Sequence, residues 1–87
     1  MKYQHYNLNY LQKGQTIEIN LSGNSANVKL MDTNNFYYYK NGKSHRYYGG
    51  HAKSSLTRLV VPQSGNWHLT IDLGGYTGNV SSNIRVY

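Results

Sequence analysis

Most of the residues that could bind a ligand lie in one segment, residues 36–53, with the sequence FYYYKNGKSHRYYGGHAK. The segment holds six of the twelve aromatic residues and four of the nine cations, Lys40, Lys43, Arg46 and Lys53, and it has no acidic residue. Lysine and arginine attract phosphates, and a guanidinium can bind one through two parallel hydrogen bonds. Aromatic rings stack on bases. The segment therefore predicts a site for a nucleotide or for single-stranded nucleic acid.

The order of residues in this segment predicts a β-hairpin. Asn41-Gly42 stands between two β-prone runs, and this pair favours a type I′ turn because both central residues need a positive φ. Alternation along each arm places aromatic rings on both faces, so one set covers a core while the other meets a partner. The pair Gly49-Gly50 allows either a close approach of the backbone to another group or a sharp turn after the second arm, and we expect the sharp turn. Two alternatives stay open: tyrosines that only cover the core beside lysines that keep a sheet edge soluble, or a subunit interface.

Three residues outside the segment extend the predicted site. Arg58 lies among the apolar residues from Leu56 to Val61, so it either faces solvent across the pleat or points its guanidinium into a pocket. We favour the pocket, where the guanidinium would bind an external anion. His68, beside Trp67, is expected to donate a hydrogen bond to the ligand. Cationic side chains would neutralise phosphates, and tyrosine rings would contact the base and ribose. The predicted ligand-binding residues are Tyr39, Lys43, Arg46, Tyr47, Tyr48, Arg58, Trp67 and His68.

The few acidic residues and the lack of cysteine limit the chemistry available. With no cysteine and only Glu18, Asp32 and Asp72 as acids, the chain is not suited to disulfides, thiol chemistry or paired-carboxylate catalysis. The four histidines show no metal-ligand spacing, so we expect no metal site and no cofactor. Residues 74–78 (GGYTG) lack the Lys-Ser/Thr end of a P-loop and predict a glycine-rich connection between strands. We therefore expect a binding protein and not an enzyme.

Short strands are the elements that must position these residues. A chain of 87 residues predicts one domain, residues 1–87. Apolar and polar residues alternate in runs bounded by Gly, Asn and Ser, and helix signals are nearly absent. These runs are 17–21, 28–30, 59–61, 67–73 and 80–86, with a weaker strand at 3–10. About seven or eight short strands predict an all-β fold, either a single antiparallel β-sandwich or a partly open β-barrel.

The composition bears on the core, the partners and the location. Only 38% of the residues are hydrophobic, so tyrosine rings are expected to supply much of the buried area, and homo-oligomerisation would supply more. The formal charge of +6 favours anionic partners. No apolar run approaches the roughly 20 residues that span a bilayer, and the polar residues after Met1-Lys2 do not resemble a signal peptide. We expect a cytoplasmic protein with no membrane partner.

Several blocks, in order along the chain, resemble a known family. They are LSGNSANVKLMD (21–32), the Asn35…Tyr39…Gly42 spacing, HRYYGG (45–50) and VPQSGNWHLTIDL (61–73), and the resemblance covers residues 3–86. The family is a small bacterial group of all-β domains of unknown function, found alone or fused to Toll/interleukin-receptor-type (TIR) domains. It offers no catalytic residues to carry over. Because bacterial TIR-type domains make or respond to NAD-derived signals in anti-phage defence, the resemblance implies a module that senses such a signal or, as a phage-type sponge, captures it.

The residues and the resemblance together predict a non-enzymatic binding module for a small anionic ligand. The specific expectation is a nucleotide immune signal, such as a cyclic nucleotide. An alternative from a different class is a protein-interaction or oligomerisation module in which the tyrosine surface packs on another subunit. A further alternative is single-stranded nucleic-acid binding, which would show a steep dependence of affinity on salt.

Overall fold

The protein is described here by a computed structural model that covers residues 2–87. Strands and one helix follow one another along the chain, and their bounds are β1 (Tyr3–Leu11), β2 (Thr16–Gly23), β3 (Ala26–Asp32), α1 (Thr33–Lys40), β4 (Tyr48–Ala52), β5 (Leu56–Val60), β6 (Gly65–Asp72) and β7 (Val80–Val86). The all-β prediction is confirmed, and the weaker strand predicted at 3–10 is present as β1.

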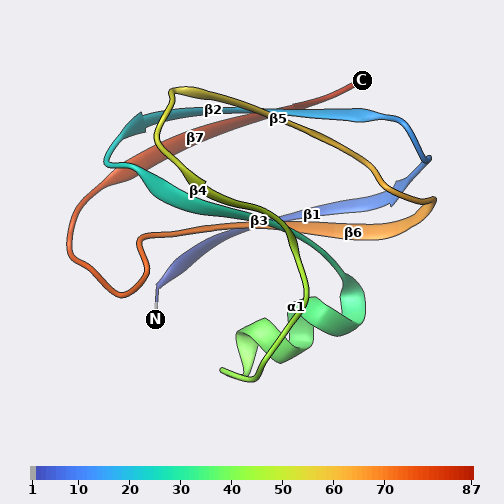
Figure 1. The fold of residues 1–87 in the computed structure, drawn as a ribbon, viewed down its shortest axis with the longest axis horizontal. Coiled ribbons are helices and arrows are strands. Elements are labelled where there is room, and N and C mark those ends of the chain that lie inside the picture. Colours follow the sequence, from blue (N-terminus) through green and yellow to red (C-terminus); the bar gives the residue numbers. More distant parts are fainter. Residues whose placement is uncertain (1) are drawn as a thin grey trace.

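The strands form two antiparallel sheets. One sheet has the order β1-β6-β3-β4 and the other the order β5-β2-β7. Figure 1 shows three layers, with β5-β2-β7 above, β1-β6-β3-β4 in the middle and α1 below. The sheets over residues 2–87 do not close into a barrel, so of the two predicted architectures the structure agrees with the sandwich.

Aliphatic side chains fill the space between the sheets. Ile17 and Ile19 of β2 face Leu30 of β3 and Leu69 and Ile71 of β6, and all five are almost completely buried, as their alternation with polar residues predicts. Tyrosines contribute less than expected. Only one of the ten is buried and two are half-buried, so the prediction that tyrosine rings supply much of the buried area is wrong. Most of these rings are available to solvent or to a partner.

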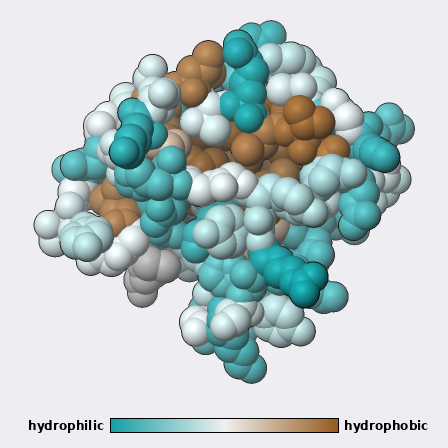
Figure 2. Space-filling view, viewed as in Figure 1, coloured by the Kyte–Doolittle hydropathy of each residue, from teal (hydrophilic) through white to brown (hydrophobic). Residues whose placement is uncertain are grey.

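Apolar surface remains along one edge of the sandwich. Figure 2 shows apolar side chains in a band between the layer of β5 and that of β3 and β4, whereas the surface around α1 is mostly polar. On β5, Val60 is 62% exposed and Leu56 is 39% exposed. The apolar surface in this view is thus separate from the polar surface around α1.

The predicted hairpin is wrong, because residues 33–40 form a helix. Asp32 caps the start of α1, and its carboxylate accepts the backbone N–H of Asn35. Gly42 follows the helix with a φ of 71°, and its N–H donates to the carbonyl of Tyr39 while the N–H of Lys43 donates to that of Tyr38. These two bonds form a Schellman motif. Asn41-Gly42 does provide a positive φ, but it ends a helix and does not join two strands.

Gly49-Gly50 is also not the predicted sharp turn. Both glycines lie inside β4, with φ of 112° and 147°. A Cβ on Gly49 would lie 2.3 Å from the carbonyl oxygen of Val28 on β3, so the backbones approach more closely there than any side chain would allow. Residues 74–78 do form the predicted glycine-rich connection, between β6 and β7.

Helix α1 lies on the outer face of the β1-β6-β3-β4 sheet. Phe36 and Tyr39 are its buried residues, and they pack with Met31 of β3 and Tyr3 of β1. This is a second, small core on the other side of the sheet from the main one. No helix within residues 2–87 has the length and apolar character needed to cross a membrane.

Candidate functional site

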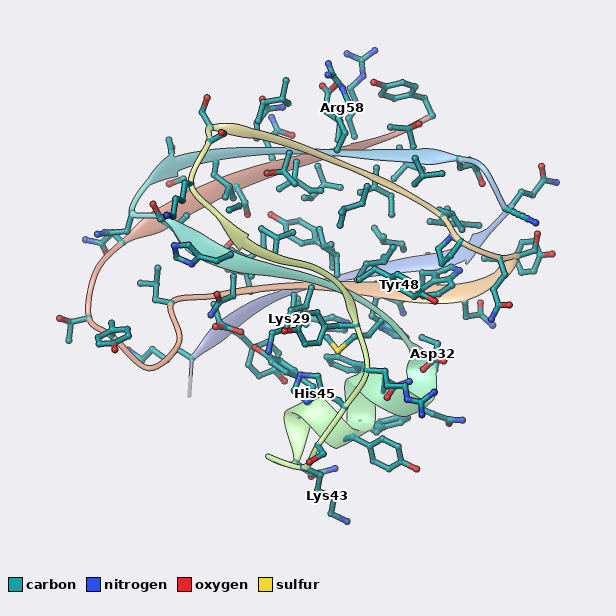
Figure 3. All side chains as sticks on the ribbon, viewed as in Figure 1. Lys29, Asp32, Lys43, His45, Tyr48 and Arg58 are labelled. Carbon is teal, nitrogen blue, oxygen red and sulfur yellow. The ribbon has the colours of Figure 1, made fainter. Side chains whose placement is uncertain are left out.

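The eight predicted ligand-binding residues lie in several different places. Figure 3 shows Arg58 above the β5-β2-β7 layer and Lys43 below α1, at opposite ends of the molecule. Three of the eight, Tyr39, Trp67 and His68, are buried. The structure therefore does not bring the eight together, and each group needs its own interpretation.

Tyr39 acts within the fold. Its hydroxyl donates to Oδ2 of Asp72 at 2.6 Å, while Oδ1 of Asp72 accepts the side-chain amide of Asn27 at 2.9 Å and the N–H of Gly74 at 2.8 Å. Burial alone would raise the pKa of Asp72, but these three hydrogen bonds outweigh it and hold the pKa below its ordinary value. Burial raises the pKa of Tyr39, and the hydrogen bond to Asp72 raises it further. The Tyr39 hydroxyl is thus a buried hydrogen-bond donor. Its ring is covered by the fold and is not the predicted stacking surface.

His68 is also engaged by protein groups. Its Nδ1 lies 2.9 Å from Nε2 of His5, and its Nε2 lies 3.1 Å from the hydroxyl of Thr33 on α1. The Phe36 ring stacks on both imidazoles, at 4.1 Å from His5 and 4.8 Å from His68 between ring centroids. Burial lowers the pKa of both histidines, with Lys40 adding to the effect at His5. His68 positions α1 and does not face a ligand as predicted.

Trp67 and Tyr48 meet on the inner side of the sheet. The indole N–H of Trp67 donates to the carbonyl of Gln63 at 2.9 Å, and its ring contacts the Tyr48 ring edge-on at 6.0 Å. Tyr48 pairs with Leu30, a core residue, so it lies on the opposite face of the sheet from α1. The Tyr48 ring is half exposed, but it does not join the cations of the α1 side.

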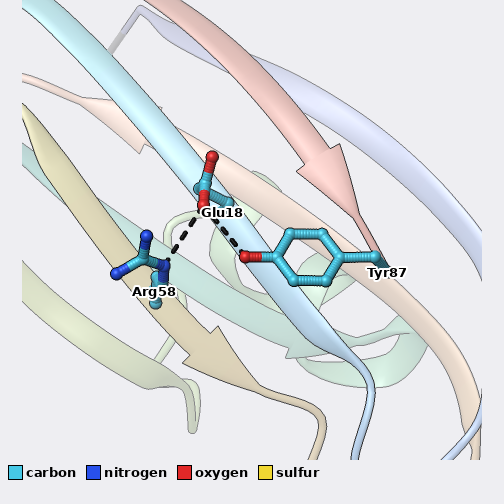
Figure 4. Close-up of polar contacts among 3 residues, drawn as sticks. All are labelled: Glu18, Arg58 and Tyr87. Atoms are coloured by element: carbon cyan, nitrogen blue, oxygen red, sulfur yellow. Dashed lines mark hydrogen bonds and ion pairs between the residues drawn. The ribbon is translucent and has the colours of Figure 1, made fainter.

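Arg58 does not point into a pocket. It lies opposite Glu18 in the β2-β5 pairing, and its Nε donates to Oε2 of Glu18 at 3.2 Å. The Tyr87 hydroxyl donates to the same oxygen at 3.0 Å (Figure 4). The Arg58 side chain is 58% exposed. The hydrogen bond from Tyr87, followed by that from Arg58, holds the pKa of Glu18 below its ordinary value. The expectation that Arg58 points into a pocket is therefore wrong, and the structure agrees with the alternative in which Arg58 faces solvent.

The other predicted residues, Lys43, Arg46 and Tyr47, lie together in the segment between α1 and β4. Of these three, Arg46 lines a hollow of about 470 Å³, which we call the α1 hollow, and Lys43 and Tyr47 are its neighbours in the chain. Its lining residues are Asp32, Asn34, Asn35, Tyr38, Ser44, His45 and Arg46. The α1 hollow is the place where a predicted cation, an exposed ring and several polar groups meet.

Asn35 fixes the two walls of the α1 hollow to each other. Its Oδ1 accepts the backbone N–H of Arg46 at 2.8 Å, and its Nδ2 donates to Oδ1 of Asp32 at 2.9 Å. The loop carrying Arg46 is thereby held against the start of α1, while the Arg46 side chain remains exposed.

Lys29 of β3 holds the other part of this segment. Its ammonium lies 3.2 Å from Nε2 of His45, 4.6 Å from the centre of the Tyr47 ring and 5.2 Å from that of Tyr39. Because an ammonium only donates, Nε2 of His45 accepts and its Nδ1–H donates to the carbonyl of Lys43 at 3.0 Å. Figure 3 shows Lys29 and His45 on the α1 side of the sheet. The ring of Tyr47 is thus oriented by the fold.

Sequence reasoning missed Asp32, Asn35, Tyr38 and Lys29 as parts of this surface. One local signal was available for the first two, since Asp at the position before a helix commonly accepts the N–H three residues later. Nothing local identifies Lys29, which reaches His45 only through the pairing of β3 in the sheet. The α1 hollow can bind by charge, stacking and hydrogen bonding. Within residues 2–87 no three His, Asp or Glu side chains gather as metal ligands would.

Comparison with known proteins adds one relationship. No curated protein matches the chain. No solved structure matches it either. The model of a family described as a domain of unknown function, DUF1883, matches residues 1–87, and the chain therefore belongs to the DUF1883 family.

Proposed function

We propose that this domain binds a small anionic ligand at the α1 hollow, that the ligand is a nucleotide, and that the domain catalyses no reaction. The observation that carries the proposal is the distribution of charge. Across residues 2–87 the ion pair between Arg58 and Glu18 is the only one, and it lies on the far sheet. Lys43 and Arg46 beside the α1 hollow therefore have no carboxylate partner in the described chain.

The remaining acids have roles in the fold. Asp72 is buried and accepts three hydrogen bonds, and Asp32 caps α1. With a formal charge of +6, the protein attracts anions, and cations without internal partners are where an anion gains most. The acids and His68 are committed to structural contacts, which supports binding without catalysis.

The groups around the α1 hollow suit the parts of a nucleotide. The Arg46 guanidinium and the Lys43 ammonium would bind phosphate, the first through its planar fork. The Tyr38 ring, 48% exposed, would stack on the base. Tyr47, 44% exposed and held by Lys29, would contact the ribose or a second base.

The resemblance described above supports a narrower version of the same proposal. If relatives are bacterial and joined to TIR-type domains, a cyclic nucleotide or another NAD-derived signal is the expected ligand. The domain would then act as a sensor, or as a sponge that captures the signal. This narrower version adds the ligand's origin and uses the same binding surface.

Calorimetry of the purified protein against a panel of nucleotides tests the proposal. The panel holds mononucleotides, cyclic di- and trinucleotides, cyclic ADP-ribose isomers and short oligonucleotides. Arg46→Ala should weaken binding roughly tenfold or more, because a charge-assisted hydrogen bond is worth about 1.5–3 kcal/mol. Arg85→Ala is the matched control, since Arg85 lies on the far sheet beside Tyr87. Absence of binding by the whole panel, or equal affinity of the two variants, would contradict the proposal.

The exposed apolar residues of β5 favour a second candidate function, an oligomerisation or protein-interaction module. Val60 and Leu56 lie on an edge strand, and Figure 2 shows the apolar band beside it. Light scattering over a range of concentrations, with Val60→Lys as the disrupting variant, distinguishes this candidate. A monomer at every concentration would contradict self-association.

A further inference from the structure

The α1 hollow contains one carboxylate, Asp32, and one oxygen of that carboxylate has no partner. The backbone N–H and the side-chain amide of Asn35 both donate to Oδ1, each at 2.9 Å. No donor from the described part of the chain reaches Oδ2. An ionised carboxylate only accepts, so Oδ2 can complete its hydrogen bonds with water or with a ligand that offers N–H groups.

We infer that the α1 hollow selects guanine over the other bases, with Oδ2 of Asp32 accepting the N1–H and N2–H groups of the base. The inference rests on the nucleotide-binding function proposed above and names the base for that same site. Guanine carries two adjacent donors on the edge that faces a carboxylate. Adenine, cytosine and uracil place an acceptor beside each donor on the same edge, and a carboxylate repels that acceptor.

The arrangement of groups around the α1 hollow also orients the ligand. Asp32 repels phosphate, whereas Arg46 and Lys43 attract it. The base is therefore directed to Asp32 and Tyr38, and the phosphate to the loop that follows α1. The amide nitrogen and oxygen of Asn35 already bond to Asp32 and to the Arg46 backbone, but the amide of Asn34 has no partner within residues 2–87 and can donate to O6 of guanine.

Asp32→Asn tests the inference without removing the helix cap, because Asn and Asp cap helices about equally well. The amide oxygen would stay on Asn35, and the amide nitrogen would replace Oδ2. A donor would then face the two N–H groups of guanine, which disfavours that base, whereas adenine offers its N1 acceptor to such a donor. The experiment is calorimetry of GMP and AMP with the wild-type protein and with D32N, and circular dichroism checks that the variant folds.

The wild-type protein should bind GMP roughly tenfold to a hundredfold more tightly than AMP, because a hydrogen-bonding site rejects a ligand that leaves its groups unpaired. D32N should lose this preference and gain affinity for AMP relative to GMP. Equal binding of GMP and AMP by the wild-type protein, or an unchanged preference in D32N, would overturn the inference and leave the proposed function standing. Absence of binding by every nucleotide would overturn both.

Discussion

The two outer faces of the sandwich each hold a carboxylate that accepts a hydrogen bond from a tyrosine hydroxyl. On the face under α1, Tyr39 donates to Asp72 at 2.6 Å, and Asp72 is 2% exposed. On the open face, Tyr87 donates to Glu18 at 3.0 Å; the Glu18 side chain is 14% exposed, and the Arg58 side chain beside it is 58% exposed. The chemical groups are the same, but a helix of eight residues covers only the first pair.

Because α1 covers only one of the two faces, the residues beneath it are structural, whereas residues on the open face are available to a partner. Without water, a carboxylate depends on every donor that the protein supplies, and removing one leaves a buried group unsatisfied. In water, lost contacts are replaced at little cost. The covered face should therefore be sensitive to small chemical changes, and the open face should tolerate the same changes.

The largest expected effect is that of Asp72→Asn. The amide cannot accept from the Tyr39 hydroxyl, the Asn27 amide and the Gly74 N–H together, and it places a donor against one of them. We expect a loss of about 3 kcal/mol in the free energy of unfolding, measured by urea denaturation. Glu18→Gln makes the same carboxylate-to-amide change on the open face and should leave the midpoint almost unchanged. Similar losses in both variants would show that cover by α1 does not decide the outcome.

Tyr39→Phe should have the next largest effect. It removes one hydrogen bond to the buried carboxylate of Asp72 and keeps the ring that packs against Tyr3, so packing should change little. The expected loss is about 1.5–2 kcal/mol, the cost of one charge-assisted hydrogen bond. Tyr87→Phe is the matched control, because it removes the equivalent hydroxyl from the open face. A Tyr39→Phe variant as stable as the wild-type protein would mean that Asp72 keeps its hydrogen bonds in another way.

The strands of the two sheets could be predicted from the sequence, but helix α1 could not. Alternation with a period of two reports burial directly, and it placed β2, β3 and β6 because each has one face in the core. Residues 33–40 are rich in Phe and Tyr, which favour strands, and only two of them are buried against the sheet. The remaining signals were Asp32 and Gly42, and a glycine with positive φ suits a hairpin turn and a helix end equally.

The candidate site was predicted only in part, because strand pairing decides which charges meet. Lys43, Arg46 and Tyr47 are close in sequence, but of these three side chains only that of Arg46 lines the α1 hollow. Glu18 and Arg58 are 40 residues apart and meet because β2 pairs with β5. Tyr39 reaches Asp72 across a comparable separation. Nothing local distinguishes a cation that is paired in this way from one that is free for a ligand.

The covered face should also respond to pH, with an effect smaller than those of the two substitutions. His5 and His68 share one proton in a hydrogen bond, and burial lowers the pKa of both. Asp32 favours a charged His68, and Lys40 disfavours a charged His5, so the groups around the pair act in opposite directions. A second proton would place two N–H groups against each other and weaken the contact of α1 with the sheet.

The direction of this pH effect follows from the lowered pKa values. Near pH 6.5 the unfolded chain binds more protons than the folded protein, so stability is complete above pH 6.5 and falls as the pH drops below it. Asp72, whose pKa is also lowered, adds a separate loss only below its ordinary pKa of 3.8. The free energy of unfolding, measured with urea at about pH 7.5 and about pH 5.5, should differ by on the order of 1 kcal/mol. The difference is no larger because His5 is exposed and water partly screens its charge.

Histidine variants assign this pH effect to the pair. His68→Gln keeps a neutral hydrogen-bonding group between His5 and Thr33 and should remove most of the pH dependence. His51→Gln is the control, because His51 is an exposed histidine on β4 that contacts only Asn27. The same pH dependence in both variants would place the titrating group elsewhere.

The smallest expected effect is the coupling between Glu18 and Arg58 on the open face. A double-mutant cycle with Glu18→Gln and Arg58→Ala, measured by urea unfolding, should give a coupling within the error of the fit, because the Arg58 side chain is 58% exposed and water screens its guanidinium, although Glu18 is only 14% exposed. A clear coupling that weakens with added salt would contradict this expectation and would make the open face structural as well.

A coupling near zero would mean that cations on the open face can be changed without loss of folding, and the binding experiments depend on this. Arg85 lies on that face beside the same glutamate, so a failure of binding in Arg46→Ala but not in Arg85→Ala would report on the α1 hollow and not on stability.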